Sequence, residues 1–197
     1  MFFCVLSKSF PFRAIIWIIL LTFAHNPKPV IRRTVKDKES EMKCVLILVG
    51  KTTDKHQAAI ISDYVERIVH YMPFSVEVIP DLKNTKNLSF SQQKEREGEQ
   101  ILRRITSSDH VVLLDERGNE RSSVDFASWL EHKIQQVRRL VFVIGGPYGF
   151  SDAVYSRSNE SISLSRMTFS HQMVRMIFTE QLYRACTIIK GEPYHHE

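Results

Sequence analysis

Apolar and polar positions follow two alternating patterns along the chain from residue 42 onward. Short continuous apolar runs, such as 43–49 and 140–144, are typical of strands buried on both faces of a parallel sheet. Between such runs, apolar residues recur every three or four positions, as amphipathic helices require. The pattern predicts strands at 43–49, 74–78, 110–114, 140–144 and 161–164, and helices at about 55–71, 91–106 and 170–190.

Strand and helix alternate over the whole of 42–197, which indicates a single α/β domain with a mostly parallel sheet. Its 156 residues are enough to bury a real core. The polar segment 115–119 (DERGN) predicts a turn around Gly118. Further helices are expected after the candidate N-caps Ser122 or Ser123 and, as a short one, after Ser151, while Thr53 or Asp54 would cap the first helix.

Residues 1–41 differ from the rest in pattern. An apolar run of eleven residues at 14–24 follows Lys8 and Arg13, so it resembles the core of a short signal peptide. It has about half of the ~20 residues that a membrane-spanning helix needs. One interpretation is an export signal. We favour the other, a start assigned too far upstream, with Met42 as the true first residue and 1–41 disordered, because the cleavage region lacks a clear A-x-A pattern.

The net charge of +5 belongs mostly to this leader. Residues 1–41 hold seven Lys and Arg against three acidic residues, whereas 42–197 holds 20 against 19. A domain so close to neutral cannot rely on a global field to hold nucleic acid. The three cysteines lie far apart without a CxxC pair, which excludes a disulfide framework or a zinc site and favours a reducing, cytoplasmic location.

The residues best suited to bind a ligand lie in the loops that follow the predicted strands. Three of the seven glycines fall in the GGPYG segment, Gly145 to Gly149, directly after a buried strand. Open α/β sheets bind ligands at this edge, although the segment also fits an ordinary tight turn. It is neither GxGxxG nor a phosphate-binding P-loop. Together with 114–118 and 164–169, it suits an adenosine-bearing ligand held through main-chain groups, or else marks three ordinary loops.

The last predicted helix and the tail after it concentrate polar groups. Glu180 and Arg184 are i, i+4 neighbours, a pair that on a surface contributes about 0–1 kcal/mol. Tyr194, His195 and His196 follow at the end of the chain. The two histidines fit a solvated tail better than a metal site, because the spacing places no third ligand, and we expect no metal.

Four motifs in order make the chain similar to a known family. FVIGGPYGF, SLSRMTFSHQMVR, EQLYRA and EPYHHE, with VLILVGK and KEREGEQIL before them, resemble the RlmH family of ribosomal RNA large-subunit methyltransferases, over Met42 to Glu197. The resemblance implies a SPOUT-type α/β fold with a C-terminal trefoil knot, a homodimer, and S-adenosylmethionine (SAM) as methyl donor. It implies N3 of a pseudouridine in a 23S rRNA hairpin as acceptor. The chain departs from the family at Ser170, where many members have Pro, and at His196, often Arg or Lys.

The resemblance also implies roles for particular residues. His195 is the candidate general base, since an unperturbed histidine titrates near pH 6.5, and the alternative is that it binds the substrate. Arg184 would hold a phosphate or a developing oxyanion, unless Glu180 fixes it as a structural pair. Arg175 and His196 are expected to contact RNA, in a local patch that also includes Arg166. The SAM site would comprise Leu114, Gly145, Leu164, Ser165, Arg166, Met167, Thr168 and Phe169.

The homodimer has a physical motive as well, because the last helix carries apolar residues on more than one side. A single contact with the sheet would not cover them all, which favours a partner helix. Two alternatives to the methyltransferase remain open at this point. One is a non-catalytic α/β module that binds RNA or a nucleotide, and the other is an exported α/β protein, which depends on the leader alone.

Overall fold

A computed structural model describes residues 42–196 and shows one five-stranded sheet in which every neighbouring pair of strands is parallel. The strand order is β2-β1-β4-β3-β5. This confirms the predicted α/β class and its parallel sheet. The trefoil knot concerns how the chain threads and stays a prediction. The strands are β1 (Lys43–Val49), β2 (Phe74–Ile79), β3 (His110–Glu120), β4 (Arg139–Ile144) and β5 (Glu160–Ser163).

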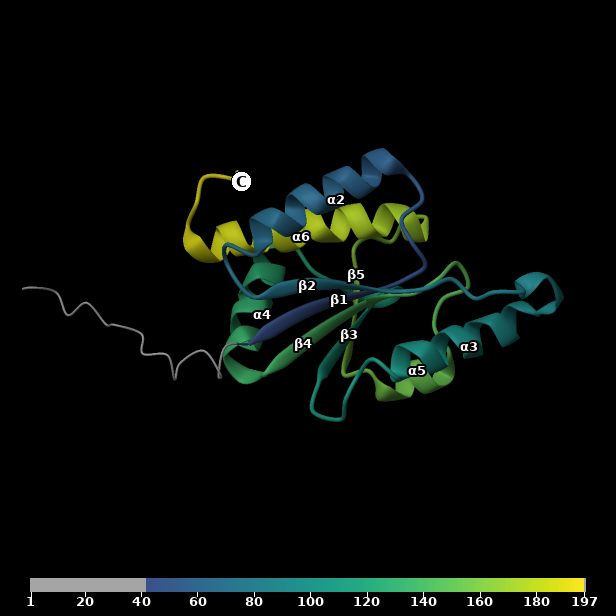
Figure 1. Ribbon diagram of the computed structural model, residues 1–197. Coiled ribbons are helices and arrows are strands. Elements are labelled where there is room, and N and C mark those ends of the chain that lie inside the picture. Colours follow the sequence, from purple (N-terminus) through teal and green to yellow (C-terminus); the bar gives the residue numbers. More distant parts are fainter. Residues whose placement is uncertain (1–41, 197) are drawn as a thin grey trace, which may run out of the picture. The chain divides into compact units, whose positions relative to one another are not determined.

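Helices cover both faces of the sheet. Figure 1 shows α2 and α6 side by side on one face, with α3 and α5 on the other. None of the helices within 42–196 is long and apolar enough to cross a bilayer. The helices are α2 (Lys55–Ile68), α3 (Phe90–Leu102), α4 (Ser123–Gln136), α5 (Asp152–Arg157) and α6 (His171–Lys190), with a 3₁₀ turn η2 (Thr85–Asn87) before α3.

Alternate residues of the central strands pack into two separate hydrophobic cores, one on each face of the sheet. Leu46 of β1 and Phe142 of β4 pack with α2, α4 and α6, whereas Ile47 and Val143 pack with α3 and α5. Successive strand side chains point to opposite faces, so a strand that is apolar at every position must be covered twice. The uninterrupted apolar runs of the sequence therefore correspond to the middle layer of three.

Side-chain caps fix where most of the helices begin. Asp54 caps α2 and Ser122 caps α4, one from each pair of candidates in the sequence. Ser89 and Gln92 form a capping box at α3. Ser170 accepts a hydrogen bond from the Met173 amide, so this serine caps α6. Helices α2 and α3 end three or four residues earlier than the periodicity predicts.

The predicted turn at residues 115–119 is wrong. Strand β3 continues to Glu120, and its pairing with β5 shifts register between Leu114 and Asn119. A Cβ atom on Gly118 would lie 2.6 Å from backbone atoms of Ile162 in β5. The glycine therefore permits a close approach between two strands rather than a turn, a contact that local residue types do not reveal.

Much of the apolar surface of α6 is covered by this same chain, whereas Met173, Met176 and Ile177 are only half-buried, so the uncovered surface is smaller than the sequence pattern predicts. Helices α2 and α4 both contact α6, and Phe178 and Leu182 are fully buried between them and the sheet. The partner helices that the pattern required are therefore internal. A homodimer needs a different argument.

We expect Gly118→Ala to lower the free energy of unfolding by about 1–3 kcal/mol, because the new methyl group meets backbone that cannot move aside. Urea unfolding followed by circular dichroism measures the loss. Asn119→Ala, at the exposed neighbouring position, is the control and should change stability by no more than about 0.5 kcal/mol. Equal stability of the two variants would contradict the close approach.

Candidate functional site

A cleft of about 610 Å³ lies at the carboxyl ends of β3, β4 and β5. This is where open parallel sheets bind ligands, and the volume lies in the range typical of nucleoside-sized molecules. Its walls are the extension of β3, the GGPYG loop, the loop after β5 and the first turn of α6. The lining residues are Lys94, Leu114–Arg117, Ile144–Phe150, Asp152, Tyr155, Ile162–Ser165, Met167–His171 and Val174.

The structure brings together nearly all of the positions that the resemblance assigns to SAM. Seven of the eight line this one cleft, namely Leu114, Gly145, Leu164, Ser165, Met167, Thr168 and Phe169. The exception is Arg166. Its side chain is 90% exposed, and its Nε atom donates to Glu120 Oε2 at 3.0 Å.

The GGPYG loop is both a tight turn and a wall of the cleft, so the two interpretations of the sequence are not exclusive. The Gly149 amide donates to the Gly146 carbonyl at 3.2 Å, and Gly149 has φ +77°, which favours glycine. A Cβ atom on Gly145 would lie 3.1 Å from the Phe150 ring. There is therefore little room for a side chain at Gly145, whereas the space beside Gly149 is open and its positive φ is the reason for a glycine there.

A buried carboxyl group supports this loop from behind. Glu97 of α3 is 5% exposed, and a Cβ atom on Gly146 would lie 2.4 Å from its Oε2 atom. Its Oε1 accepts from Gln93 Nε2 at 3.0 Å, while its Oε2 has no hydrogen-bond partner among the described residues. Burial raises the pKa of Glu97, which favours the neutral acid beneath the loop.

The loop after β5 is shaped by its own serines. Ser163 Oγ donates to the Ser165 carbonyl at 2.8 Å, and Ser165 Oγ accepts from the Met167 amide at 2.9 Å. Thr168 Oγ1 donates to Glu116 Oε2 at 3.0 Å, which joins this loop to the extension of β3. Met167 is left 72% exposed at the rim of the cleft. These hydrogen bonds thus fix the backbone of the loop, and the apolar side chain of Met167 remains exposed beside the cleft.

The cleft carries charges of both signs. Tyr155 donates its hydroxyl to Asp115 Oδ2, and burial together with this carboxylate raises the pKa of Tyr155 to about 12. Lys94 and Arg117 line other parts of the wall. Within residues 42–196, no group of three or more His, Cys, Asp or Glu side chains is arranged to hold a metal ion. The site suits a mixed polar ligand rather than a polyanion alone.

His171 is a cleft residue that sequence reasoning missed. The sequence motifs gave it no role, yet the structure places it in the cleft wall at the start of α6. Its burial, and then the nearby Arg175 guanidinium, lower its pKa. The available signal was its position immediately after the loop that carries most of the proposed SAM residues.

The candidate catalytic pair lies at the other end of α6. Arg184 donates to Glu180 Oε1 at 2.6 Å, and its Nη1 atom lies 3.4 Å from His195 Nδ1. The Arg184 guanidinium also stacks over the Tyr194 ring, whose hydroxyl donates to Glu180 Oε1 at 3.1 Å. These contacts hold the tail against α6. They agree with the alternative in which Glu180 fixes Arg184 as a structural pair.

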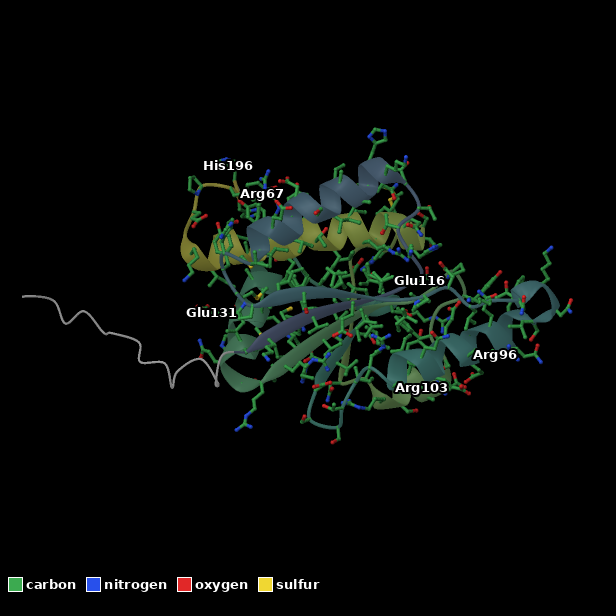
Figure 2. The ribbon with its side chains drawn as sticks, viewed as in Figure 1. Arg67, Arg96, Arg103, Glu116, Glu131 and His196 are labelled. Carbon is green, nitrogen blue, oxygen red and sulfur yellow. The ribbon has the colours of Figure 1, made fainter. Side chains whose placement is uncertain are left out.

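Within one chain this pair is far from the cleft. His171 and Val174 of α6 line the cleft, and Arg184, the residue that His195 contacts, lies 13 and 10 residues further along the helix, a rise of about 15–20 Å. Figure 2 shows the same separation, with His196 of the tail and Glu116 of the cleft at opposite ends of α6. His195 therefore cannot reach a ligand in the cleft of its own chain in this conformation.

Arg175 does not lie where an RNA contact would need it. Its side chain is fully buried, and it donates to the Val49 carbonyl at 2.6 Å and to Thr52 Oγ1 at 3.1 Å. The reason is its place on α6, because position 175 falls on the same face as Phe178 and Leu182. Arg175 is a structural residue in this fold, and we no longer place it among the RNA contacts.

Comparisons with known proteins agree with this geometry. A family model described as a predicted SPOUT methyltransferase matches residues 42–195. Proteins named Ribosomal RNA large subunit methyltransferase H from Phocaeicola vulgatus, Bacteroides fragilis and Flavobacterium psychrophilum are 60%, 58% and 55% identical over 157 residues. Each alignment covers the whole relative and 79% of this chain. The chain belongs to the SPOUT methyltransferases and, within them, to the family that these relatives form.

We expect Gly146→Ala to destabilise the protein by about 1–3 kcal/mol, because its methyl group collides with the Glu97 carboxyl group. The same substitution in a Glu97→Ala background should cost much less, since the obstacle is gone. Urea unfolding of both single variants and the double variant gives the coupling energy. Additive effects would show that Glu97 does not support the loop.

Proposed function

We propose that this protein transfers a methyl group from SAM to N3 of a pseudouridine in a 23S rRNA hairpin of the large ribosomal subunit. The observation that carries the proposal is the cleft, where seven of the eight positions implied for SAM meet at one edge of the sheet. The relatives named for large-subunit rRNA methylation, 55–60% identical over their whole length, support the rRNA acceptor. The pseudouridine and its N3 atom rest on the motif resemblance.

The residues of the cleft fit a bound SAM molecule. Backbone groups of the GGPYG loop and of the loop after β5, which line the cleft, would hold the adenine by hydrogen bonds, and Leu114 and Ile144 would supply apolar contact. When bound, SAM supplies a sulfonium methyl group with high intrinsic reactivity. The protein's contribution is then mainly to hold the donor and the acceptor nitrogen in line.

The acceptor nitrogen carries a proton at neutral pH, which has to leave. His195 remains our candidate for removing it or for binding the base, with Arg184 beside it. Because about 15–20 Å of helix separates them from the cleft of their own chain, we propose a homodimer in which the tail of one copy completes the cleft of the other. The exposed Met167 and the stacked pair of Phe90 and Tyr148 near the cleft provide apolar surface for that contact.

RNA recognition is proposed to depend on a local patch. Arg166 and His196 are exposed, and Lys94 and Arg117 line the cleft. With a domain charge near neutral, the shape of a folded ribosomal substrate supplies the remaining specificity. We place the enzyme in the cytoplasm with the ribosome. Cys44 and Cys186 are both buried as free thiols, and burial raises the pKa of each, which suits a reducing compartment.

We expect the purified protein to incorporate tritium from methyl-labelled SAM into ribosomes that lack the modification, and less into free 23S rRNA. Scintillation counting followed by nucleoside analysis identifies the product as N3-methylpseudouridine. Ribosomes that already carry the modification are the control. SAM binding without any incorporation would favour the alternative of a non-catalytic nucleotide-binding module.

A complementation experiment tests the shared site. A variant with a blocked cleft, Gly145→Trp, and the tail variant His195→Ala should each be inactive, because each lacks one half of every site. Mixed after subunit exchange, they should recover about one quarter of the wild-type sites, since half of the dimers then contain one complete site. A His195→Ala variant with full turnover and unchanged SAM affinity would remove His195 from the mechanism.

A further inference from the structure

The side-chain amide of Gln172, the second residue of α6, is oriented by the loop after β1. Its Nε2 atom donates to the Lys51 carbonyl at 3.2 Å, and its Oε1 atom accepts from the Thr53 amide at 3.4 Å. A carbonyl oxygen can only accept and a backbone N–H can only donate. These two partners therefore determine which end of the Gln172 amide carries the hydrogens.

The same amide determines the tautomer of the preceding histidine. Gln172 Nε2 lies 3.1 Å from His171 Nε2, and an amide NH₂ group donates two hydrogens and accepts none. One hydrogen goes to the Lys51 carbonyl, so the other points to the ring. His171 Nε2 must then be the unprotonated acceptor, and the proton of the neutral ring lies on Nδ1. Nδ1 has no hydrogen-bond partner among residues 42–196.

The surroundings keep this ring neutral and in place. Burial and the Arg175 guanidinium both lower the pKa of His171, against a weaker opposing effect of Asp81. Arg175 also ties the loop after β1 to α6 through the Val49 carbonyl and Thr52 Oγ1. The loop that orients Gln172 is thus itself fixed, and His171, a residue of the cleft wall, has one N–H donor, at Nδ1.

We propose that His171 is a ligand-binding residue of the cleft, whose Nδ1–H donates a hydrogen bond to an acceptor oxygen of a bound substrate. This rests on the proposed function, since two substrates bring such an oxygen: the carboxylate of SAM and the ring carbonyls of the acceptor base. Gln172 is the positioning residue, because it acts only through the tautomer of His171.

The tautomer is tested directly by long-range ¹H–¹⁵N correlation spectra of protein labelled with ¹⁵N-histidine. His171 is assigned from the signals that disappear in His171→Asn. We expect the pattern of a neutral Nδ1–H ring at pH 7, and a larger Nε2–H fraction in Gln172→Leu. An Nε2–H pattern in the wild-type protein would overturn the proposal.

The hydrogen bond is tested with two variants of matched size. His171→Asn retains an N–H donor near the position of Nδ1, whereas His171→Leu removes it. The His171→Leu variant should bind the ligand about 3- to 10-fold more weakly than wild type, as expected for the loss of one hydrogen bond. The His171→Asn variant should retain most of the wild-type affinity. His132→Leu, at an exposed position of α4, is the control and should change nothing.

Two measurements separate the two possible oxygens. Calorimetry with S-adenosylhomocysteine and no ribosome reports the donor carboxylate, and the KM for unmodified ribosomes at saturating SAM reports the acceptor base. If His171→Leu changes one of these two values and His171→Asn restores it, that measurement identifies the oxygen to which His171 donates. Equal values for wild type, Leu and Asn in both overturn the proposal. The spectra and the calorimetry need no methyl transfer, so a failure of the proposed reaction is distinguished from a failure of this role.

Discussion

The burial of the central strands on both faces is the constraint on which the rest of the structure depends. Strands β1 and β4 are apolar at almost every position, so helices must cover both sides of the sheet. Parallel pairing then requires each connection to cross back over a face, and all strands end at the same edge. The extension of β3 and the loops after β4 and β5 meet there because of this arrangement, and together they form the cleft.

Helix α6 links the two halves of the proposed chemistry. Its first turn reaches the cleft, where Gln172 and Arg175 join it to the loop after β1. Its last turns hold Glu180 and Arg184, which order the tail and His195. A straight helix of 20 residues cannot bring its two ends together. The argument for a dimer therefore comes from the separation along this helix more than from its apolar surface, most of which α2 and α4 cover.

The sequence predicted the features that local patterns determine. All five strands and the parallel sheet follow from periodicity and residue type, and the caps Asp54 and Ser122 were each one of two candidates. Contacts between distant segments were not accessible in the same way. The segment around Gly118 has the composition of a turn, and only its pairing with β5 makes it a strand. Seven of the eight positions carried over for SAM line one cleft, but the Nδ1–H of His171 emerges only from atoms of the loop after β1.

The inward direction of Arg175 has a consequence for RNA recognition. Burial lowers the pKa of Arg175. Its guanidinium donates to a backbone carbonyl and to a hydroxyl, and no carboxylate of the described residues lies within 4 Å of it. Such a cation organises the fold and contributes little to the field outside. Arg184 is paired with Glu180, and Arg166 with Glu120. Because most of the expected cations are neutralised or buried, electrostatic attraction is weak, and a folded ribosomal surface has to supply binding energy through shape and through contacts at the exposed rim of the cleft.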